Sequence, residues 1–194
     1  MDFGSIIVTF LRLVIPISIL RYPLGGFIAC LALDSFDAPL VDIIGRRGAL
    51  FGGGFIDYHL IDKWLDLYFL FFAFLSSLKW QNSFAKKAAI SLFSLRSLGV
   101  ILFSLTKLRI FLFFFPNIFE FFYLYYLISK RYFPKILPNS LLKLLIAIII
   151  LGVPKIFIEY FLHIKQLKLA EIINYLTPLE IPTPTIWEWL KTLF

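Results

Sequence analysis

Residues 58–78 read YHLIDKWLDLYFLFFAFLSSL, an apolar and aromatic run that is interrupted by Asp62 and Asp66. The run is as long as the roughly 20 apolar residues that a helix needs to cross a bilayer. A carboxylate near the bilayer centre costs at least about 2.5 kcal/mol on insertion scales. The two aspartates therefore predict a helix that turns one face toward a wet cavity or a bound cation.

The rest of the chain has the same apolar character, with 60% hydrophobic residues among 194. Breaks at Pro, Gly and charged residues separate about six apolar runs of membrane-spanning length. We expect spans at roughly 4–20, 23–43, 57–79, 86–106, 109–128 and 141–163. The predicted fold is all-α: a polytopic membrane protein with about six transmembrane helices in one bundle, and a single domain over residues 1–194. The amphipathic tail, 164–194, predicts a C-terminal interfacial helix.

Composition excludes several other classes of protein. The single Cys30 rules out an intramolecular disulfide, and no Cys/His set has the spacing of a structural zinc site. The net charge of +7 comes from Lys and Arg spread along loops and helix ends, a pattern that indicates contact with membrane lipids. Since no basic block interleaves with aromatic residues, we expect no nucleic-acid partner.

Acidic residues are concentrated in one part of the chain, the segment 34–66. Six of the seven aspartates lie there: Asp34, Asp37, Asp42, Asp57, Asp62 and Asp66. Spacings of three (Asp34 and Asp37) and four (Asp62 and Asp66) put each pair on one helix face. Two adjacent antiparallel helices would then present four carboxylates across one gap. Such an all-oxygen set suits Mg²⁺ or Mn²⁺, with one carboxylate available as a general base.

Further polar residues fall at a similar depth in other predicted spans. We expect Arg96, Asn117 and Glu120 to line the same cavity on its substrate-binding side, with Glu120 holding Arg96 and Asn117 using the gap left by Pro116. The competing interpretation is a closed Arg96–Glu120 pair. In the glycine-rich segment 45–54, Arg46 and Arg47 are candidates to clasp a substrate phosphate or, alternatively, to anchor lipid headgroups.

Two motifs in this chain resemble the CDP-alcohol phosphatidyltransferase family. The family motif D-x-x-D-G-x-x-A-R, followed by G-x-x-x-D-x-x-x-D, is matched by Asp34-Ser-Phe-Asp37 and Asp62-Lys-Trp-Leu-Asp66. Thr9-Phe-Leu-Arg12-Leu-Val-Ile-Pro16 is similar to a stretch that often opens the family. The chain departs from the motif by having Ala38 for its Gly, Val41-Asp42 for its Ala-Arg, and Tyr58 for its second Gly.

The resemblance implies a fold of six membrane helices and a specific reaction. A phosphatidyl-type group would pass from a CDP-linked lipid to a small hydroxyl acceptor, as a step of phospholipid synthesis. Asp34, Asp37, Asp62 and Asp66 would bind Mg²⁺ or Mn²⁺, and Asp66 would also serve as the catalytic base. The implied location is a prokaryotic plasma membrane, with the polar cavity facing the cytoplasm, and the chain is compatible with a homodimer.

Other functions fit the same residues. The aspartates can instead be paired with Arg12, Arg96 or Lys63 in a structural network, which would make the chain a non-catalytic membrane subunit or a lipid binder. An acidic cavity in a membrane also suits a cation transporter. The distribution of Lys and Arg slightly prefers the opposite membrane orientation to the one that the transferase interpretation needs.

Overall fold

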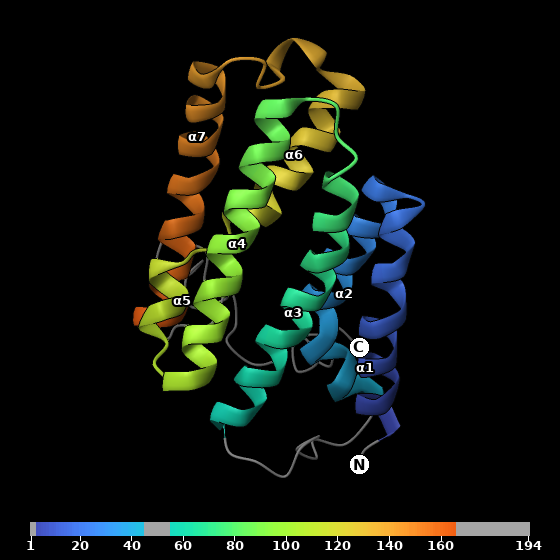
Figure 1. The fold of residues 1–194 in the computed structure, drawn as a ribbon. Coiled ribbons are helices and arrows are strands. Elements are labelled where there is room, and N and C mark those ends of the chain that lie inside the picture. Colours follow the sequence, from blue (N-terminus) through green and yellow to red (C-terminus); the bar gives the residue numbers. More distant parts are fainter. Residues whose placement is uncertain (1–2, 45–54, 166–194) are drawn as a thin grey trace, which may run out of the picture.

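The computed structural model describes residues 3–44 and 55–165, and the side chains of residues 7–34, 60–161 and 163–165. All regular structure in these residues is helical, and the helices stand side by side as one bundle (Figure 1). The first half of the chain contains α1 (Phe3–Val14), the 3₁₀ segment η1 (Ile15–Leu20), α2 (Pro23–Ile44) and α3 (Phe55–Ser77). The second half contains α4 (Ser83–Thr106), α5 (Ile110–Phe114), α6 (Ile118–Tyr132), the 3₁₀ turn η2 (Pro134–Ile136), α7 (Leu141–Glu159) and the π-helical turn η3 (Tyr160–Ile164).

Three helical segments are long and apolar enough to cross a membrane. They are α4, the run Ile110–Tyr132 that comprises α5 and α6, and α7. Two shorter apolar helical segments, Ile7–Leu20 and Pro23–Asp34, come earlier in the chain. The all-α prediction is confirmed for the described residues, and helices occupy the positions of all six predicted spans. The predicted interfacial helix in 164–194 lies almost wholly outside the described residues.

Polar caps start two of the long helices at the same end of the bundle. The side chain of Asn82 accepts from the Ala85 N–H at 2.9 Å before α4, and that of Ser140 accepts from the Lys143 N–H at 3.4 Å before α7. These bonds satisfy backbone donors that a helix leaves unpaired in its first turn. Asn82 also donates through Nδ2 to Asn139 Oδ1 at 2.8 Å. The α3–α4 turn and the α6–α7 connection therefore meet at one end (Figure 1).

An aromatic core joins α2, α3, α4 and α6. Phe27, Phe119, Phe122 and Tyr123 are fully buried. Trp80 stacks on Tyr126, with ring centroids 3.7 Å apart. The beginning of α3 lies at the end of the bundle opposite the α3–α4 turn (Figure 1).

The fifth predicted span, 109–128, is broken where a continuous helix was expected. α5 ends at Phe114 and α6 begins at Ile118, because Pro116 has no N–H to continue the helical bonding. α4 accommodates the break: Arg96 Nη1 donates to the Phe115 carbonyl at 3.2 Å. A Cβ atom on Gly99 would lie 2.4 Å from the Phe115 Cβ. The break is thus built into the packing of α4.

Candidate functional site

Three of the four predicted metal ligands come together at one point between α2 and α3. Asp34, Asp62 and Asp66 each offer a carboxylate oxygen, and these oxygens all lie within 4.8 Å of one another. Asp62 and Asp66 share a face of α3 by their spacing of four, and Asp34 approaches from α2. The side chain of Asp37 lies outside the described residues. The convergence was predicted for four aspartates and is seen for the three whose side chains are described. Their role as metal ligands stays a prediction.

Arg12, from α1, inserts its guanidinium group between the three carboxylates. Its Nη1 donates to Asp62 Oδ1 at 2.9 Å, and its Nη2 donates to Asp34 Oδ1 at 2.6 Å and to Asp66 Oδ1 at 2.8 Å. The Arg12 side chain is only 7% exposed. A single cationic group therefore ties α1 to both α2 and α3.

Lys63 binds the opposite side of the α3 pair. Its Nζ donates to Asp62 Oδ2 and to Asp66 Oδ2, each at 2.8 Å. Asp62 and Asp66 are thus each shared between Arg12 on Oδ1 and Lys63 on Oδ2, which closes a ring of alternating charges. We refer to Arg12, Asp34, Asp62, Lys63 and Asp66 as the acid-rich cluster. With every group ionised, these five described side chains have three negative and two positive charges, a sum of −1.

Among the described side chains of the acid-rich cluster, Asp34 is the most exposed. The side chain of Asp34 is 37% exposed, against 10% for Asp66 and 18% for Asp62. Asp66 is thus the most buried of the three acids.

The donor set fits a hard divalent cation. Mg²⁺ and Ca²⁺ bind carboxylate oxygens at about 2.0–2.6 Å, so oxygens on opposite sides of one ion are about 4–5 Å apart. The three aspartate oxygens, all within 4.8 Å of one another, satisfy this condition. The space between them is taken by the Arg12 guanidinium, so a cation has to replace that group in order to bind all three.

A second group of charged residues surrounds the break between α5 and α6. Glu159 Oε2 and His163 Nε2 are 2.8 Å apart, and the Asn117 N–H donates to Glu159 Oε1 at 3.4 Å. Lys155 Nζ lies 3.4 Å from Glu120 Oε2 and 3.9 Å from Glu159 Oε1. Together with Arg96 we name these residues the balanced cluster: Arg96, Asn117, Glu120, Lys155, Glu159 and His163. With His163 neutral, its two carboxylates and two cations cancel.

The predicted residues Arg96, Asn117 and Glu120 all lie in the balanced cluster, but their pairing differs from the expectation. Glu120 accepts from Asn117 Nδ2 at 2.6 Å and from Lys155, whereas Arg96 donates to the Phe115 carbonyl. The break in the helix supplies that free carbonyl, so Arg96 is held by backbone and not by Glu120. Arg96 Nε and Asn117 Oδ1 are buried without a hydrogen-bond partner among the described residues.

Sequence reasoning missed the contribution of α7 to this cluster. Lys155, Glu159 and His163 recur every four residues, which puts all three on one face of a helix. That pattern was a usable signal, because ionisable residues on one face of an apolar helix normally turn toward the bundle interior. The two clusters are also neighbours: Lys63 of one is within electrostatic range of Arg96 and His163 of the other.

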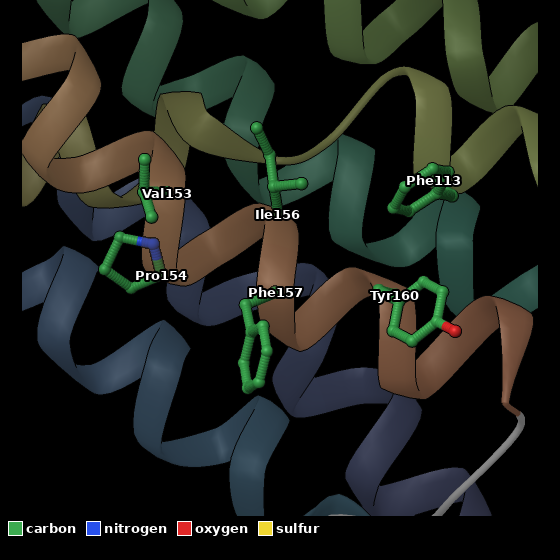
Figure 2. A pocket seen from close by; sticks show the side chains of 6 residues that line it. All are labelled: Phe113, Val153, Pro154, Ile156, Phe157 and Tyr160. Atoms are coloured by element: carbon green, nitrogen blue, oxygen red, sulfur yellow. The ribbon is translucent and has the colours of Figure 1, made fainter.

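One cavity among the described residues is apolar and lies between α5, α7 and η3. Figure 2 shows its six lining side chains, which come from α5, α7 and η3 and enclose about 490 Å³. They are Phe113, Val153, Pro154, Ile156, Phe157 and Tyr160. Val153 and Phe157 are exposed, so the cavity is a groove on the outer face of α7. Such a surface suits lipid contact, and the Tyr160 hydroxyl is the polar group among its lining side chains (Figure 2).

Two predicted phosphate-binding residues, Arg46 and Arg47, lie outside the described residues. Comparison of the chain with models of known protein families, with curated proteins and with solved structures gave no significant match. The resemblance to the CDP-alcohol phosphatidyltransferases therefore stays a prediction that is based on the motif residues alone.

Proposed function

We propose that the protein is an integral membrane enzyme whose acid-rich cluster binds a divalent cation. Its reaction is the transfer of a phosphatidyl-type group from a CDP-linked lipid to a hydroxyl acceptor. The single observation that carries the proposal is the convergence of Asp34, Asp62 and Asp66 within 4.8 Å, from two neighbouring helices; among the described side chains, two cations bind these three acids. A buried excess of negative charge is costly in a membrane unless a cation offsets it.

The six-span arrangement is part of this proposal. Three segments have the length and apolarity of spans. The other three are α1 with η1, α2, and α3. Among the described side chains of these helices, five charged residues bind one another: Arg12, Asp34, Asp62, Lys63 and Asp66. This mutual neutralisation lowers the cost of placing such helices in lipid, which supports counting them as spans.

Each residue of the cluster has a defined part in the proposal. Asp34, Asp62 and Asp66 would hold the cation, and a bound Mg²⁺ or Mn²⁺ supplies a Lewis acid for phosphoryl oxygens. Asp66, the most buried of the three acids, would take the proton of an acceptor hydroxyl. Both of its oxygens are engaged, Oδ1 by Arg12 and Oδ2 by Lys63. Asp66 can therefore act as a base only after one of these hydrogen bonds has been released.

A second candidate function is favoured by the same contacts. Because Arg12 and Lys63 already bind the aspartates, the cluster can serve as a purely structural joint between α1, α2 and α3. The chain would then be a non-catalytic membrane protein. This candidate requires no cation and no substrate, so a direct binding measurement separates the two.

The decisive experiment measures Mn²⁺ binding to the full chain in detergent micelles by electron paramagnetic resonance, followed by an assay of CMP release from a CDP-linked lipid. We expect wild-type protein to bind Mn²⁺ and Asp66→Asn to lose both binding and CMP release, since the amide has the size of the carboxylate but no charge. Glu120→Gln, in the balanced cluster, is the control for Mn²⁺ binding. Wild-type protein that binds no Mn²⁺ would favour the structural joint.

A further inference from the structure

The end of the bundle at which the α3–α4 turn meets the α6–α7 connection contains basic residues and no acidic ones. Residues 78–90 and 128–145, which form this end, include seven Lys or Arg and no Asp or Glu. In the part of the chain that the structure describes, none of these cations pairs with a carboxylate. Six are exposed and one, Lys86, is half-buried. We name them the basic end: Lys79, Lys86, Lys87, Lys130, Arg131, Lys135 and Lys143.

The α6–α7 connection has the residues that are typical of the lipid headgroup region. Lys143 Nζ donates to the Lys135 carbonyl at 3.4 Å, so the start of α7 and the connection place these two residues next to each other. Tyr132 and Phe133 are exposed, and the Arg131 guanidinium lies 5.4 Å from the centre of the Tyr132 ring. Exposed aromatic rings among cations are characteristic of the boundary between membrane and water. The basic end therefore fits a position at the level of lipid phosphates.

The outer face of α7 continues from the basic end as a stripe of exposed apolar side chains. Its members are spaced by three and four residues, so they share one face of the helix. Lys143 lies three residues before Ile146, at the head of the same face. We name the apolar residues the outer stripe, and each is between 47% and 69% exposed: Leu142, Leu145, Ile146, Ile149, Ile150 and Val153.

The length of the outer stripe matches one leaflet of a bilayer. Lys143 and Val153 are separated by about 15 Å along α7, at 1.5 Å per residue. Half of a hydrocarbon core that is about 30 Å thick is also about 15 Å. A lipid with its phosphate at Lys143 would thus have an acyl chain against the stripe as far as the bilayer midplane. There Val153 borders the apolar groove of Figure 2.

A second copy of the chain fits this surface less well than a lipid does. Two copies in one membrane that meet through the same face are related by an axis along the membrane normal, so their equivalent ends lie together. Contact through the outer stripe would bring the basic ends of both copies close to each other. Like charges repel, and residues 78–90 and 128–145 contain no acid to offset them. An anionic lipid supplies the charge that this surface lacks.

We propose that the outer stripe and the basic end together bind one anionic phospholipid, with its phosphate at Lys135 and Lys143 and an acyl chain along the stripe. The cations select the lipid by its net negative charge, and the stripe contributes apolar contact of matching length. This inference goes beyond the proposed function and does not depend on the acid-rich cluster, since none of its residues belongs to that cluster.

The first test uses the wild-type full chain in phosphatidylcholine vesicles that contain a phosphatidylglycerol with a photoreactive diazirine in its acyl chain. After irradiation, mass spectrometry locates the labelled residues. We expect label on the outer stripe, and we expect it to fall severalfold when part of the phosphatidylcholine is replaced by unlabelled phosphatidylglycerol. An unchanged label after this replacement would show that the surface does not select anionic lipid. Crosslinking of α7 to α7 of a second copy, with no lipid label on the stripe, would make it a dimer interface and overturn the proposal.

The second test removes the two lysines that are assigned to the phosphate. We expect the double variant Lys135→Gln, Lys143→Gln to be labelled about tenfold less than wild type, because each lysine near an anionic headgroup adds to binding. Both residues are exposed, so the melting temperature should stay the same. Lys165→Gln is the matched control, because Lys165 is also exposed but follows η3, beyond the other end of α7. Equal labelling of the double variant and wild type would show that these lysines do not hold the lipid.

Discussion

The acid-rich cluster and the balanced cluster contain similar types of residue but differ in net charge and in exposure. The acid-rich cluster has three carboxylates against two cations and is partly open at Asp34, whose side chain is 37% exposed. In the balanced cluster two carboxylates meet two cations, and Glu159 is only 4% exposed. A cluster that is closed and neutral is suited to holding helices together. A cluster with excess charge and an opening is suited to binding an ion, and the comparison locates the candidate site in the first.

The largest expected difference between the clusters concerns the loss of one carboxylate. Glu159→Gln leaves the balanced cluster with an uncompensated buried positive charge, and we expect it to lower the free energy of unfolding by about 3 kcal/mol. Asp62→Asn is the matched change in the acid-rich cluster. It brings that cluster from −1 to zero, so we expect a loss of no more than about 1 kcal/mol. Unfolding of both variants in the same detergent, without divalent cations, measures the difference, and equal losses would erase the distinction.

Added cation should stabilise the protein through the acid-rich cluster alone. A ligand at 100 times its dissociation constant stabilises the folded state by about 2.7 kcal/mol. We therefore expect Mg²⁺ to raise the melting temperature of wild type and of Glu120→Gln, and to have no effect on Asp66→Asn. If Mg²⁺ still raised the melting temperature of Asp66→Asn but not that of Glu120→Gln, the result would indicate that the ion binds at the balanced cluster.

A third prediction concerns the close packing beside the balanced cluster. In Gly99→Ala the new Cβ would lie 2.4 Å from the Phe115 Cβ, so α4 and the helix break must separate. We expect a loss of about 1–3 kcal/mol in the free energy of unfolding. Gly25→Ala is the control, because no atom lies within 4 Å of the point where its new methyl group would stand, and it should change stability by about 0.5 kcal/mol or less. A tolerated Gly99→Ala would show that the break can shift freely.

The smallest change in stability is expected at α3, the helix that contributes Asp62, Lys63 and Asp66 to the acid-rich cluster. Trp64 Nε1 donates to Ser104 Oγ at 3.0 Å at an exposed position that links α3 to α4. Trp64→Phe removes this bond and should cost about 0.5–1 kcal/mol. Ser104→Ala should cost a similar amount, and the double variant should cost less than the sum of the two. Full additivity in thermal unfolding would mean that the bond contributes nothing.

The apolar runs predicted the helices, and the spacing of the aspartates predicted that Asp34, Asp62 and Asp66 would lie close together. Both predictions follow from the order of residues along the chain. Apolar runs fix where helices begin and end, and spacings of three and four fix which face each aspartate takes. The predicted helix 57–79 and the observed α3, Phe55–Ser77, differ by two residues at each end. Convergence of Asp34 with Asp62 and Asp66 then needed only two adjacent antiparallel helices.

Pairing across the bundle could not be predicted in the same way. Arg12 had several carboxylates within its possible reach, and only the relative rotation of α1, α2 and α3 decides that it binds three of them. Similarly, Pro116 signalled an irregularity in the fifth span, but the partner of Arg96 depends on where the freed Phe115 carbonyl points. Contacts between side chains of different helices depend on how those helices pack, and this packing could not be derived from the sequence pattern.

The position of Arg12 in the chain has a consequence for how the protein enters a membrane during synthesis. Arg12 is translated 22 residues before Asp34 and 54 residues before Asp66. In the six-span arrangement, α1 therefore precedes the two helices that carry the carboxylate partners of its guanidinium group. An arginine at the centre of a lone helix costs about 2.5–3.5 kcal/mol to insert. The first helix should thus insert poorly by itself and become stable only together with the two helices that follow.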